Sequence, residues 1–310
     1  MRWQNKEKSQ NVDDRRGQTI STGGGIGIGA IILALLALLL GGNPLSVLQQ
    51  ASQPQTTQTQ ASGPYQPKTQ EEAALSEVVQ VTLKETEDVW NKLFREQLGR
   101  SYPEPTMVLF SGRTTSACGA ASSATGPFYC PGDEDLYIDL SFYDEMKNKF
   151  RAAGDFAIAY IIAHEVGHHV QHQLAITTKV EQQKRRSSKT VANQLSVRLE
   201  LQADFLAGVW AHHAEKMNRA ETGRGILEEG DIEEALNSAA SVGDDRIQKQ
   251  ARGYVVPDSF THGTSEQRKR WFMKGLQSGQ VADGDTFSIC LLYTSPSPRD
   301  ATLSRMPSSA

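Results

Sequence analysis

The sequence predicts a mainly helical α+β domain with a small sheet, preceded by one transmembrane helix. Three observations predict this class. Residues 23–42 form an apolar run without charge, long stretches beyond residue 71 have helical periodicity, and two short apolar strands lie between them. The 310 residues allow one domain of roughly 200 residues plus a leader. A formal charge of −4 and the lack of a dominant basic patch argue against a nucleic-acid partner.

The leader predicts a membrane anchor. Residues 1–22 are basic, and residues 23–42 are just long enough, at about 20 residues, to span a bilayer as a helix. Because no basic residues follow closely, we expect a single-pass protein with a cytoplasmic N-terminus and a periplasmic or extracytoplasmic domain. In a bacterium the anchor would lie in the inner membrane. A cleaved signal peptide is the alternative, although no clear small-residue cleavage site follows the run.

Two further segments are expected to carry no site. Residues 43–70 are rich in Gln, Thr, Ser, Ala and Pro, which is typical of a flexible linker, here leading to a domain over 71–289. Residues 290–310 look like the translation of a transposase adaptor used in sequencing libraries, so we expect them to be non-native. Cys290 then drops out of the cysteine count.

Cys118 and Cys130 remain, twelve residues apart in a region rich in Gly, Ser and Ala. Outside the cytoplasm, such a pair predicts a disulfide. The alternative is a metal site, but there is no C-x-x-C motif and no nearby His.

Apolar periodicity sets the remaining elements. It predicts helices over residues 71–98, 156–174, 190–217, 231–247 and 265–276. It predicts strands over residues 106–110 and 135–143. The charged stretch over residues 179–189 is expected to be a solvated loop or helix face.

The helix over 156–174 carries the motif His-Glu-Val-Gly-His at residues 164–168. Residues four apart lie on one helix face, so both imidazoles can bind one metal ion. Glu165 can then take a proton from a water bound to that metal. Gly167 is unfavourable inside a helix, and a close approach by another backbone would explain it. The pattern indicates zinc-dependent hydrolysis, most often of peptide bonds.

A metal site needs at least a third protein ligand, and Glu200 is the best candidate. Glu200 and Asp204 are four apart on the buried helix over 190–217. One carboxylate would bind the metal, and the other would accept the remaining ring N–H of a histidine ligand. A pair of buried salt bridges is the alternative. His169 and His172 are expected on the polar face of the first helix.

These motifs resemble the gluzincin group of metallopeptidases, in which H-E-x-x-H is completed by the Glu of an E-x-x-x-D helix. The resemblance implies that His164, His168 and Glu200 bind Zn²⁺. It also implies that Asp204 orients His164.

More closely, the chain resembles the bacterial putative neutral zinc metallopeptidase family over nearly its whole length up to about residue 288. The segments that carry this resemblance include residues 1–4, 13–17, 126–131, 137–142, 164–171, 200–204 and 260–272. It implies a zincin-like domain with two metal-bearing helices. In zincin folds an edge strand beside the cleft pairs with extended substrate, and residues 137–142 are our candidate for it. An ordinary sheet strand is the alternative.

The segment from His262 to Arg268 resembles the H-x(5)-R element of membrane metallopeptidases with the same two-helix zinc core. The resemblance implies that His262 steadies the developing oxyanion, while Arg268 braces the segment or the metal site. A capping role for His262 at a helix entry is the alternative.

We therefore predict a membrane-anchored, zinc-dependent metalloendopeptidase-like hydrolase that acts on peptides or proteins. Glu165 is its expected general base and His262 its expected second catalytic residue. Two alternatives remain: a membrane-tethered binding or scaffold module with a structural zinc site, and a zinc hydrolase of a non-peptide substrate. The sequence gives no prediction of the oligomeric state.

Overall fold

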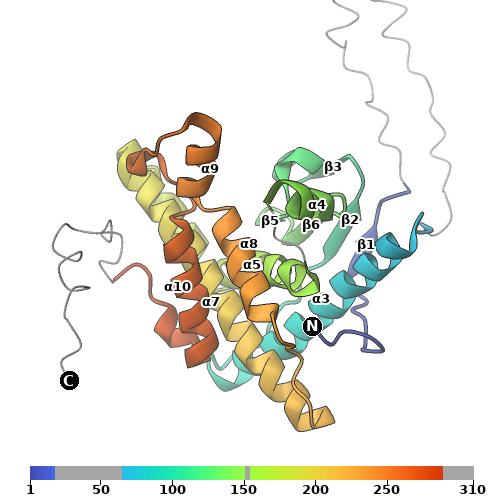
Figure 1. The fold of residues 1–310 in the computed structure, drawn as a ribbon. Helices are drawn as coiled ribbons and strands as arrows, with labels where there is room; N and C mark the ends of the chain where they lie inside the picture. The colour runs from blue at the N-terminus through green and yellow to red at the C-terminus, as the bar shows by residue number, and fades with distance from the viewer. Residues whose placement is uncertain (18–64, 151–153, 289–310) are drawn as a thin grey trace, which may run out of the picture. The chain divides into compact units, whose positions relative to one another are not determined.

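The computed structural model describes residues 1–17, 65–150 and 154–288 (Figure 1). The predicted membrane span over 23–42 and the adaptor-like stretch over 290–310 lie outside these residues. None of the described helices has the length and apolar character needed to cross a bilayer.

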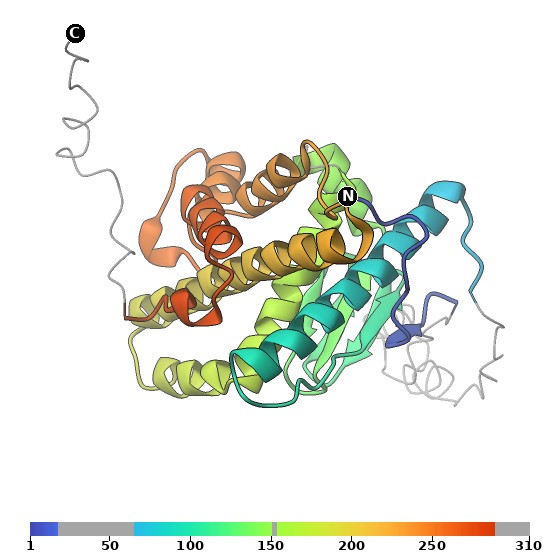
Figure 2. The same ribbon diagram turned by 90° about the horizontal axis from the view of Figure 1, so that it is seen from below.

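Helices make up most of the domain. They are α3 (Gln70–Glu96), α4 (Phe142–Glu145), α5 (Asp155–Gln173), α6 (Ile176–Lys184), α7 (Lys189–Thr222), α8 (Asp231–Ser241), α9 (Asp244–Arg252) and α10 (Ser265–Ser278). Short helical turns are η1 (Ser123–Thr125), η2 (Met146–Phe150), η3 (Pro257–Ser259) and η4 (Val281–Gly284). Helix α7 packs against both α5 and α10, and α3 packs against α5 (Figure 2). The main hydrophobic core lies between these helices.

A four-stranded sheet has the order β1-β2-β6-β5. Its strands are β1 (Val12–Asp14), β2 (Met107–Phe110), β5 (Phe128–Cys130) and β6 (Asp135–Asp139). β2 and β6 are parallel, with Met107 opposite Leu136, whereas β5 and β6 are antiparallel. A separate hairpin is formed by β3 (Arg113–Ser116) and β4 (Gly119–Ser122).

The prediction of residues 137–142 as the edge strand was wrong. Strand β6 pairs with β2 on one side and β5 on the other, so β5 is the edge on this side of the described sheet. Strand β6 also ends at Asp139, and the chain enters α4 at Phe142. With three residues, β5 is too short to show the alternation by which strands are recognised in a sequence.

The long predicted helices are present with ends shifted by a few residues, and the charged stretch after residue 175 forms α6. The helix predicted over 231–247 is instead two helices, broken at Val242 and Gly243. A Cβ on Gly243 would lie 2.6 Å from the backbone nitrogen of Ser265. The break therefore lets the start of α10 approach the chain closely.

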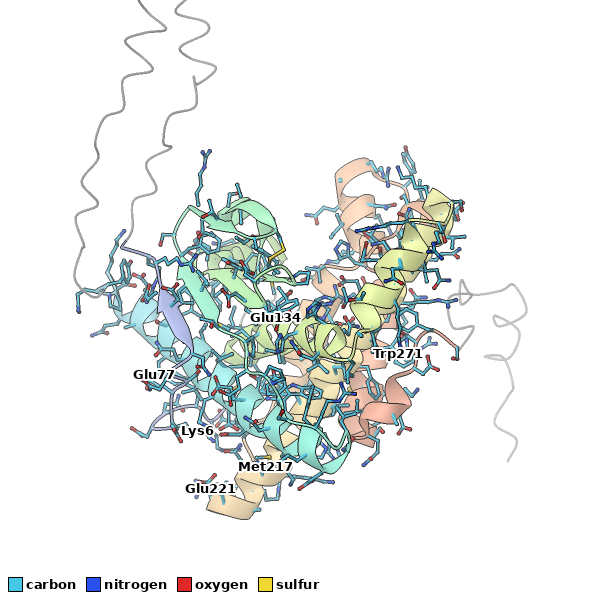
Figure 3. All side chains as sticks on the ribbon, turned by 180° about the vertical axis from the view of Figure 1, so that it is seen from behind. Lys6, Glu77, Glu134, Met217, Glu221 and Trp271 are labelled. Atoms are coloured by element: carbon cyan, nitrogen blue, oxygen red, sulfur yellow. A yellow bond between two sulfur atoms is a disulfide. The ribbon has the colours of Figure 1, made fainter. Side chains whose placement is uncertain are left out.

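The N-terminal segment differs most from expectation, because residues 1–13 belong to the same compact unit as the chain from residue 67 onward. The Met1 side chain is buried, and the Trp3 indole N–H donates to Asp155 at 2.8 Å. Lys6 contacts Glu85 of α3 and Asn218 of α7, near the labelled Met217 (Figure 3). Basic residues that predicted a membrane flank thus pair with the domain.

Three glycines set how closely the helices pack. A Cβ on Gly208 of α7 would lie 2.1 Å from the Phe272 carbonyl oxygen, and one on Gly275 of α10 would lie 2.0 Å from the Phe205 carbonyl oxygen. Gly167 of α5 faces the backbone of Ala203 in α7, which gives the close approach expected for it. Side chains here would push α5, α7 and α10 apart.

We predict that Gly208→Ala lowers the free energy of unfolding by about 2 kcal/mol or more, since the added methyl overlaps backbone that cannot move aside. Urea unfolding would measure it. Lys216→Ala, at an exposed position of the same helix, is the control and should change stability by less than about 0.5 kcal/mol. Equal stability of Gly208→Ala and the parent would contradict the close packing of α7 and α10.

Candidate active site

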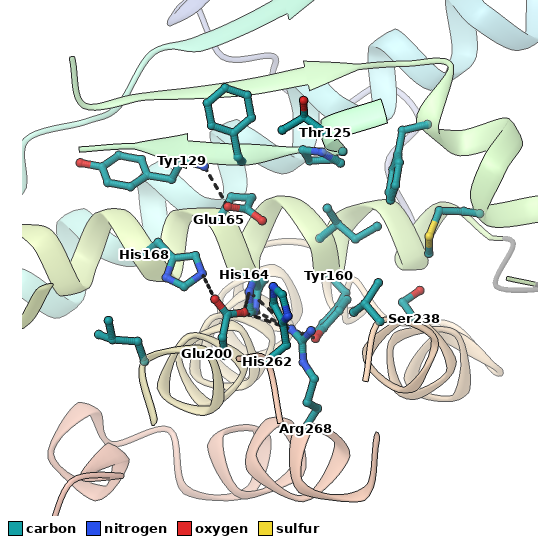
Figure 4. Close-up of a pocket in the computed structure, with 18 of the residues that line it drawn as sticks. Thr125, Tyr129, Tyr160, His164, Glu165, His168, Glu200, Ser238, His262 and Arg268 are labelled. Carbon is teal, nitrogen blue, oxygen red and sulfur yellow. Dashed lines mark hydrogen bonds and ion pairs between the residues drawn. The ribbon is translucent and has the colours of Figure 1, made fainter. Parts of the chain in front are cut away.

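Helices α5 and α7 bring the three predicted metal ligands together (Figure 4). The Nε2 atom of His164 lies 3.3 Å from one Glu200 carboxylate oxygen, and Nε2 of His168 lies 3.5 Å from the other. Tetrahedral zinc with bonds of ~2.0–2.2 Å separates its ligand atoms by about 3.3 Å. Two neutral imidazoles and a carboxylate are also a donor set that zinc favours. The three residues therefore fit one zinc ion.

Asp204 and Arg268 form a buried ion pair beside these ligands. The Nδ1 atom of His164 lies 2.9 Å from Asp204 Oδ1. Arg268 donates to both Asp204 oxygens, at 2.8 and 2.9 Å. The Tyr160 hydroxyl donates to the same carboxylate. Asp204 thus lies where it can fix the His164 ring, and Arg268 compensates its charge.

The charges of this cluster favour a bound cation. Burial alone would raise the pKa of Asp204, but Arg268 and His164 outweigh it and hold the pKa below its usual value. Burial would likewise raise the pKa of Glu200, yet the two histidines and Arg268 lower it. Burial opposes the charged form of His164, but Asp204 and Glu200 raise its pKa to about 9. The site therefore favours a proton or a metal ion on His164 over a free lone pair.

His168 is held by a residue that the sequence analysis did not identify. Its Nδ1 atom lies 2.9 Å from the Gln171 side-chain oxygen, and the Gln171 amide donates to the Leu199 carbonyl at 2.7 Å. The spacing of three on one helix could have indicated this pair. Gln171 therefore fixes the ring of the second histidine as Asp204 fixes the first.

Glu165 connects the metal-bearing helix to the edge strand. One carboxylate oxygen accepts the Tyr129 backbone N–H of β5 at 2.9 Å. Burial raises the pKa of Glu165, against the opposing charges of His168 and His164. A carboxylate with a raised pKa beside a metal site can both accept a proton and return it.

His262 lines the same cavity from the loop before α10. One oxygen of Asp244 accepts the backbone N–H groups of Thr261, His262 and Gly263, at 2.8, 2.6 and 2.9 Å. The other oxygen lies 3.4 Å from His262 Nδ1. This hydrogen bond raises the pKa of His262, with burial opposing it. The helix cap is Thr264, so His262 does not cap α10.

The remaining histidines lie apart from the metal ligands. His169 is fully buried, which corrects its predicted place on the polar face: its ring bonds the Pro103 carbonyl at 2.7 Å and the Tyr129 hydroxyl at 3.2 Å. His172 is half-buried, and its Nε2 atom lies 3.6 Å from a carboxylate oxygen of Glu134. His212 and His213 bond carbonyls at the end of α10 and just beyond it.

A cavity of about 480 Å³ opens over the metal ligands. Strand β5 and the residues before it form one wall, and helices α5, α7 and α8 with the loop at His262 form the others. The predicted disulfide between Cys118 and Cys130 is present, and Cys130 is the last residue of β5. The disulfide thus ties the end of the edge strand to the β3–β4 hairpin.

The fold and these contacts define a His-His-Glu metal site shared between two helices and opening on a sheet edge. The chain belongs to the family described as putative neutral zinc metallopeptidase, whose model matches residues 1–287. Membership implies zinc as the metal.

Two relatives illustrate the family. The chain is 46% identical over 294 residues to the uncharacterized protein YpfJ of Escherichia coli K12, covering 93% of this chain and 99% of that protein. It is 44% identical over 191 residues to the uncharacterized protein Rv2575 of Mycobacterium tuberculosis H37Rv, covering 60% of this chain and 64% of that protein. No solved structure matches the chain.

We predict that Asp244→Asn lowers the pKa of His262 toward about 6.5, because the substitution removes the carboxylate that favours the charged ring. The charged groups of Glu200 and Arg268 also face this ring and stay unchanged. NMR titration of the ring protons would measure the shift. In the parent, the raised pKa of His262 stabilises the fold fully below about pH 6.5, and this contribution is lost as the pH rises through the raised pKa. The lowered pKa of Asp244 contributes stability above about pH 3.9, and this contribution is lost as the pH falls through the lowered pKa.

His213, whose pKa burial lowers, serves as the internal control because it bonds the Gly279 carbonyl and has no contact with Asp244. An unchanged His262 pKa in Asp244→Asn would contradict the assigned pairing.

Proposed function

We propose that the protein is a zinc-dependent peptidase. The observation that supports this most directly is the spacing of His164, His168 and Glu200, with Glu165 beside them in one cavity. A purely structural zinc site has no use for a further acidic residue beside its three ligands. A zinc site with a carboxylate that is not one of the ligands, next to an open cavity, is suited to hydrolysis.

In this proposal the three ligands hold the ion, and Asp204 and Gln171 keep the two imidazoles oriented. Zinc, when bound, lowers the pKa of water and polarises a carbonyl group. Glu165 accepts the proton of the attacking water and passes it to the leaving amine. Its hydrogen bond to β5 holds one oxygen in place and leaves the other for this transfer.

His262 is the proposed donor to the oxyanion. The ring lines the cavity, and Asp244 favours its protonated form. In that form both ring nitrogens carry a proton, so Nδ1 can bond Asp244 while Nε2 donates to the oxyanion. Arg268 acts on Asp204 and so positions His164, without a role in the reaction itself.

Strand β5 favours a peptide as the substrate. It is the edge strand of the described sheet on the side of the cavity, and an extended peptide can lie against such an edge, where the Tyr129 N–H already donates to Glu165. Strand β5 therefore takes the role that the sequence analysis gave to residues 137–142. A small non-peptide substrate would not need this edge.

We also propose that the domain works outside the cytoplasm and is attached to the membrane through residues 23–42. The disulfide supports an oxidising compartment, since such bonds persist in the periplasm and are rare in the cytosol. The apolar run itself lies outside the described residues, and the proposal for it rests on the sequence.

We predict that Glu165→Gln keeps zinc but lowers kcat/KM for peptide cleavage by at least a factor of about 10², because the amide cannot accept the water proton. Metal analysis and cleavage of a quenched fluorescent peptide mixture would measure both. Glu181→Gln, on the half-exposed face of α6, is the matched control and should keep full activity. Chelation should stop cleavage and added zinc should restore it.

Full activity of Glu165→Gln would refute the general base. If chelation lowers the melting temperature and no peptide is ever cleaved, a structural zinc module is the better description.

A further inference from the structure

The cavity continues past the metal ligands into a region with mostly apolar walls. Its residues come from α4, η2, α5, α8 and the residue just after α8: Phe142, Met146, Ile161, Ser238 and Val242. Ile161 lies one helical turn before His164, on the same face of α5. This apolar subsite is therefore next to the point where the scissile carbonyl would sit.

Ser238 is the exception in the apolar subsite. Its side chain is 1% exposed, and its hydroxyl has no hydrogen-bond partner among the described residues. Buried polar groups are normally paired, so an unpaired hydroxyl in a cavity wall indicates a partner that arrives with a ligand. Tyr160 also lines the cavity, but its hydroxyl is already bonded within the protein, because it donates to Asp204.

Resting on the proposed peptidase function, we propose that the apolar subsite binds the side chain next to the scissile bond and selects large apolar residues. The Ser238 hydroxyl adds a hydrogen bond to a side chain that is apolar along its length and polar at its tip, as in tyrosine. Acidic side chains are disfavoured, because the subsite offers them no positive charge.

Peptide hydroxamates test the subsite apart from catalysis. The zinc-loaded protein would be titrated with hydroxamates carrying Leu, Phe, Tyr, Ala or Asp beside the zinc-binding group. We expect Leu, Phe and Tyr to bind at least about tenfold more tightly than Ala or Asp. Ser238→Ala should lower the preference for Tyr over Phe by about threefold or more, since one neutral hydrogen bond is lost.

Val242→Trp, at the half-buried rim of the subsite, should weaken binding of the Leu, Phe and Tyr hydroxamates alike. Val191→Trp, at an exposed position of α7, is the control and should leave their binding unchanged. Equal binding of all five hydroxamates, or a Tyr preference untouched by Ser238→Ala, would overturn the subsite. Absence of peptide cleavage with the preferences intact would refute the peptidase function and leave the subsite standing.

A second, independent observation concerns the N-terminal segment. Residues 1–13 contact four separate parts of the domain. Arg2 donates to the Gly225 carbonyl at 2.7 Å, and the Ser9 backbone N–H donates to the Gln80 carbonyl at 3.1 Å. The Asn11 carbonyl accepts the backbone N–H of Met107, the first residue of β2, at 2.8 Å. Trp3 holds the start of α5 through Asp155.

These contacts constrain membrane topology. A single crossing between residues 14 and 66 would place residues 1–13 and the domain on opposite faces of a bilayer about 40–45 Å thick. Groups so separated cannot be hydrogen-bonded. We infer that residues 1–13 lie on the same side of the membrane as the peptidase domain.

Thiol labelling in intact bacterial cells tests this inference. In full-length protein with Cys290→Ser, single cysteines would be introduced at the exposed positions Gln10 or Glu221. A membrane-impermeant maleimide should label Gln10→Cys and Glu221→Cys to the same extent, with lysed cells as the control for reactivity. Labelling of Glu221→Cys alone, with Gln10→Cys labelled only after lysis, would overturn it.

Discussion

The buried pair of Asp204 and Arg268 is the interaction on which the rest of the site depends. Asp204 fixes the tautomer of His164, yet a buried carboxylate is costly unless it is compensated. Arg268 compensates it from a third helix. One ion pair thus joins α5, α7 and α10, and it can form only because Gly208 and Gly275 let α7 and α10 meet backbone to backbone.

The two walls of the cavity are joined in a different way. Glu165 extends from α5 to the Tyr129 backbone at the middle of β5, and the disulfide holds Cys130 at the end of that strand. A three-residue strand would have little stability by itself. Fixed at its middle and its last residue, it can keep a constant distance from the metal ligands. In the proposed mechanism the same carboxylate therefore serves both the strand and the chemistry.

The main helices and the metal ligands could be predicted from the sequence, because each depends on residues close together in the chain. The pairs His164–His168 and Glu200–Asp204 each repeat at a helical spacing, and long apolar periodicity marked the main helices. What was missed depends on contacts between distant parts of the chain. The contacts between Asp244 and His262 join residues 18 apart in the chain, and no local sequence pattern indicates them.

One pattern can also suit two environments. Basic residues before an apolar run are typical of a membrane flank, and the same charges also pair with carboxylates of the domain. The placement of His169 on a polar face was wrong, because a carbonyl and a hydroxyl satisfy its ring inside the core.

The docked N-terminal segment also sets an order of events during synthesis. The Met1 amino group lies 3.0 Å from Asp231, 230 residues along the chain. At about 5–20 residues per second, the first residues made must wait on the order of 10–50 s before this partner leaves the ribosome. The apolar run at 23–42 emerges well within that time. In the proposed membrane-attached protein, this run would therefore meet the bilayer before the N-terminal segment docks.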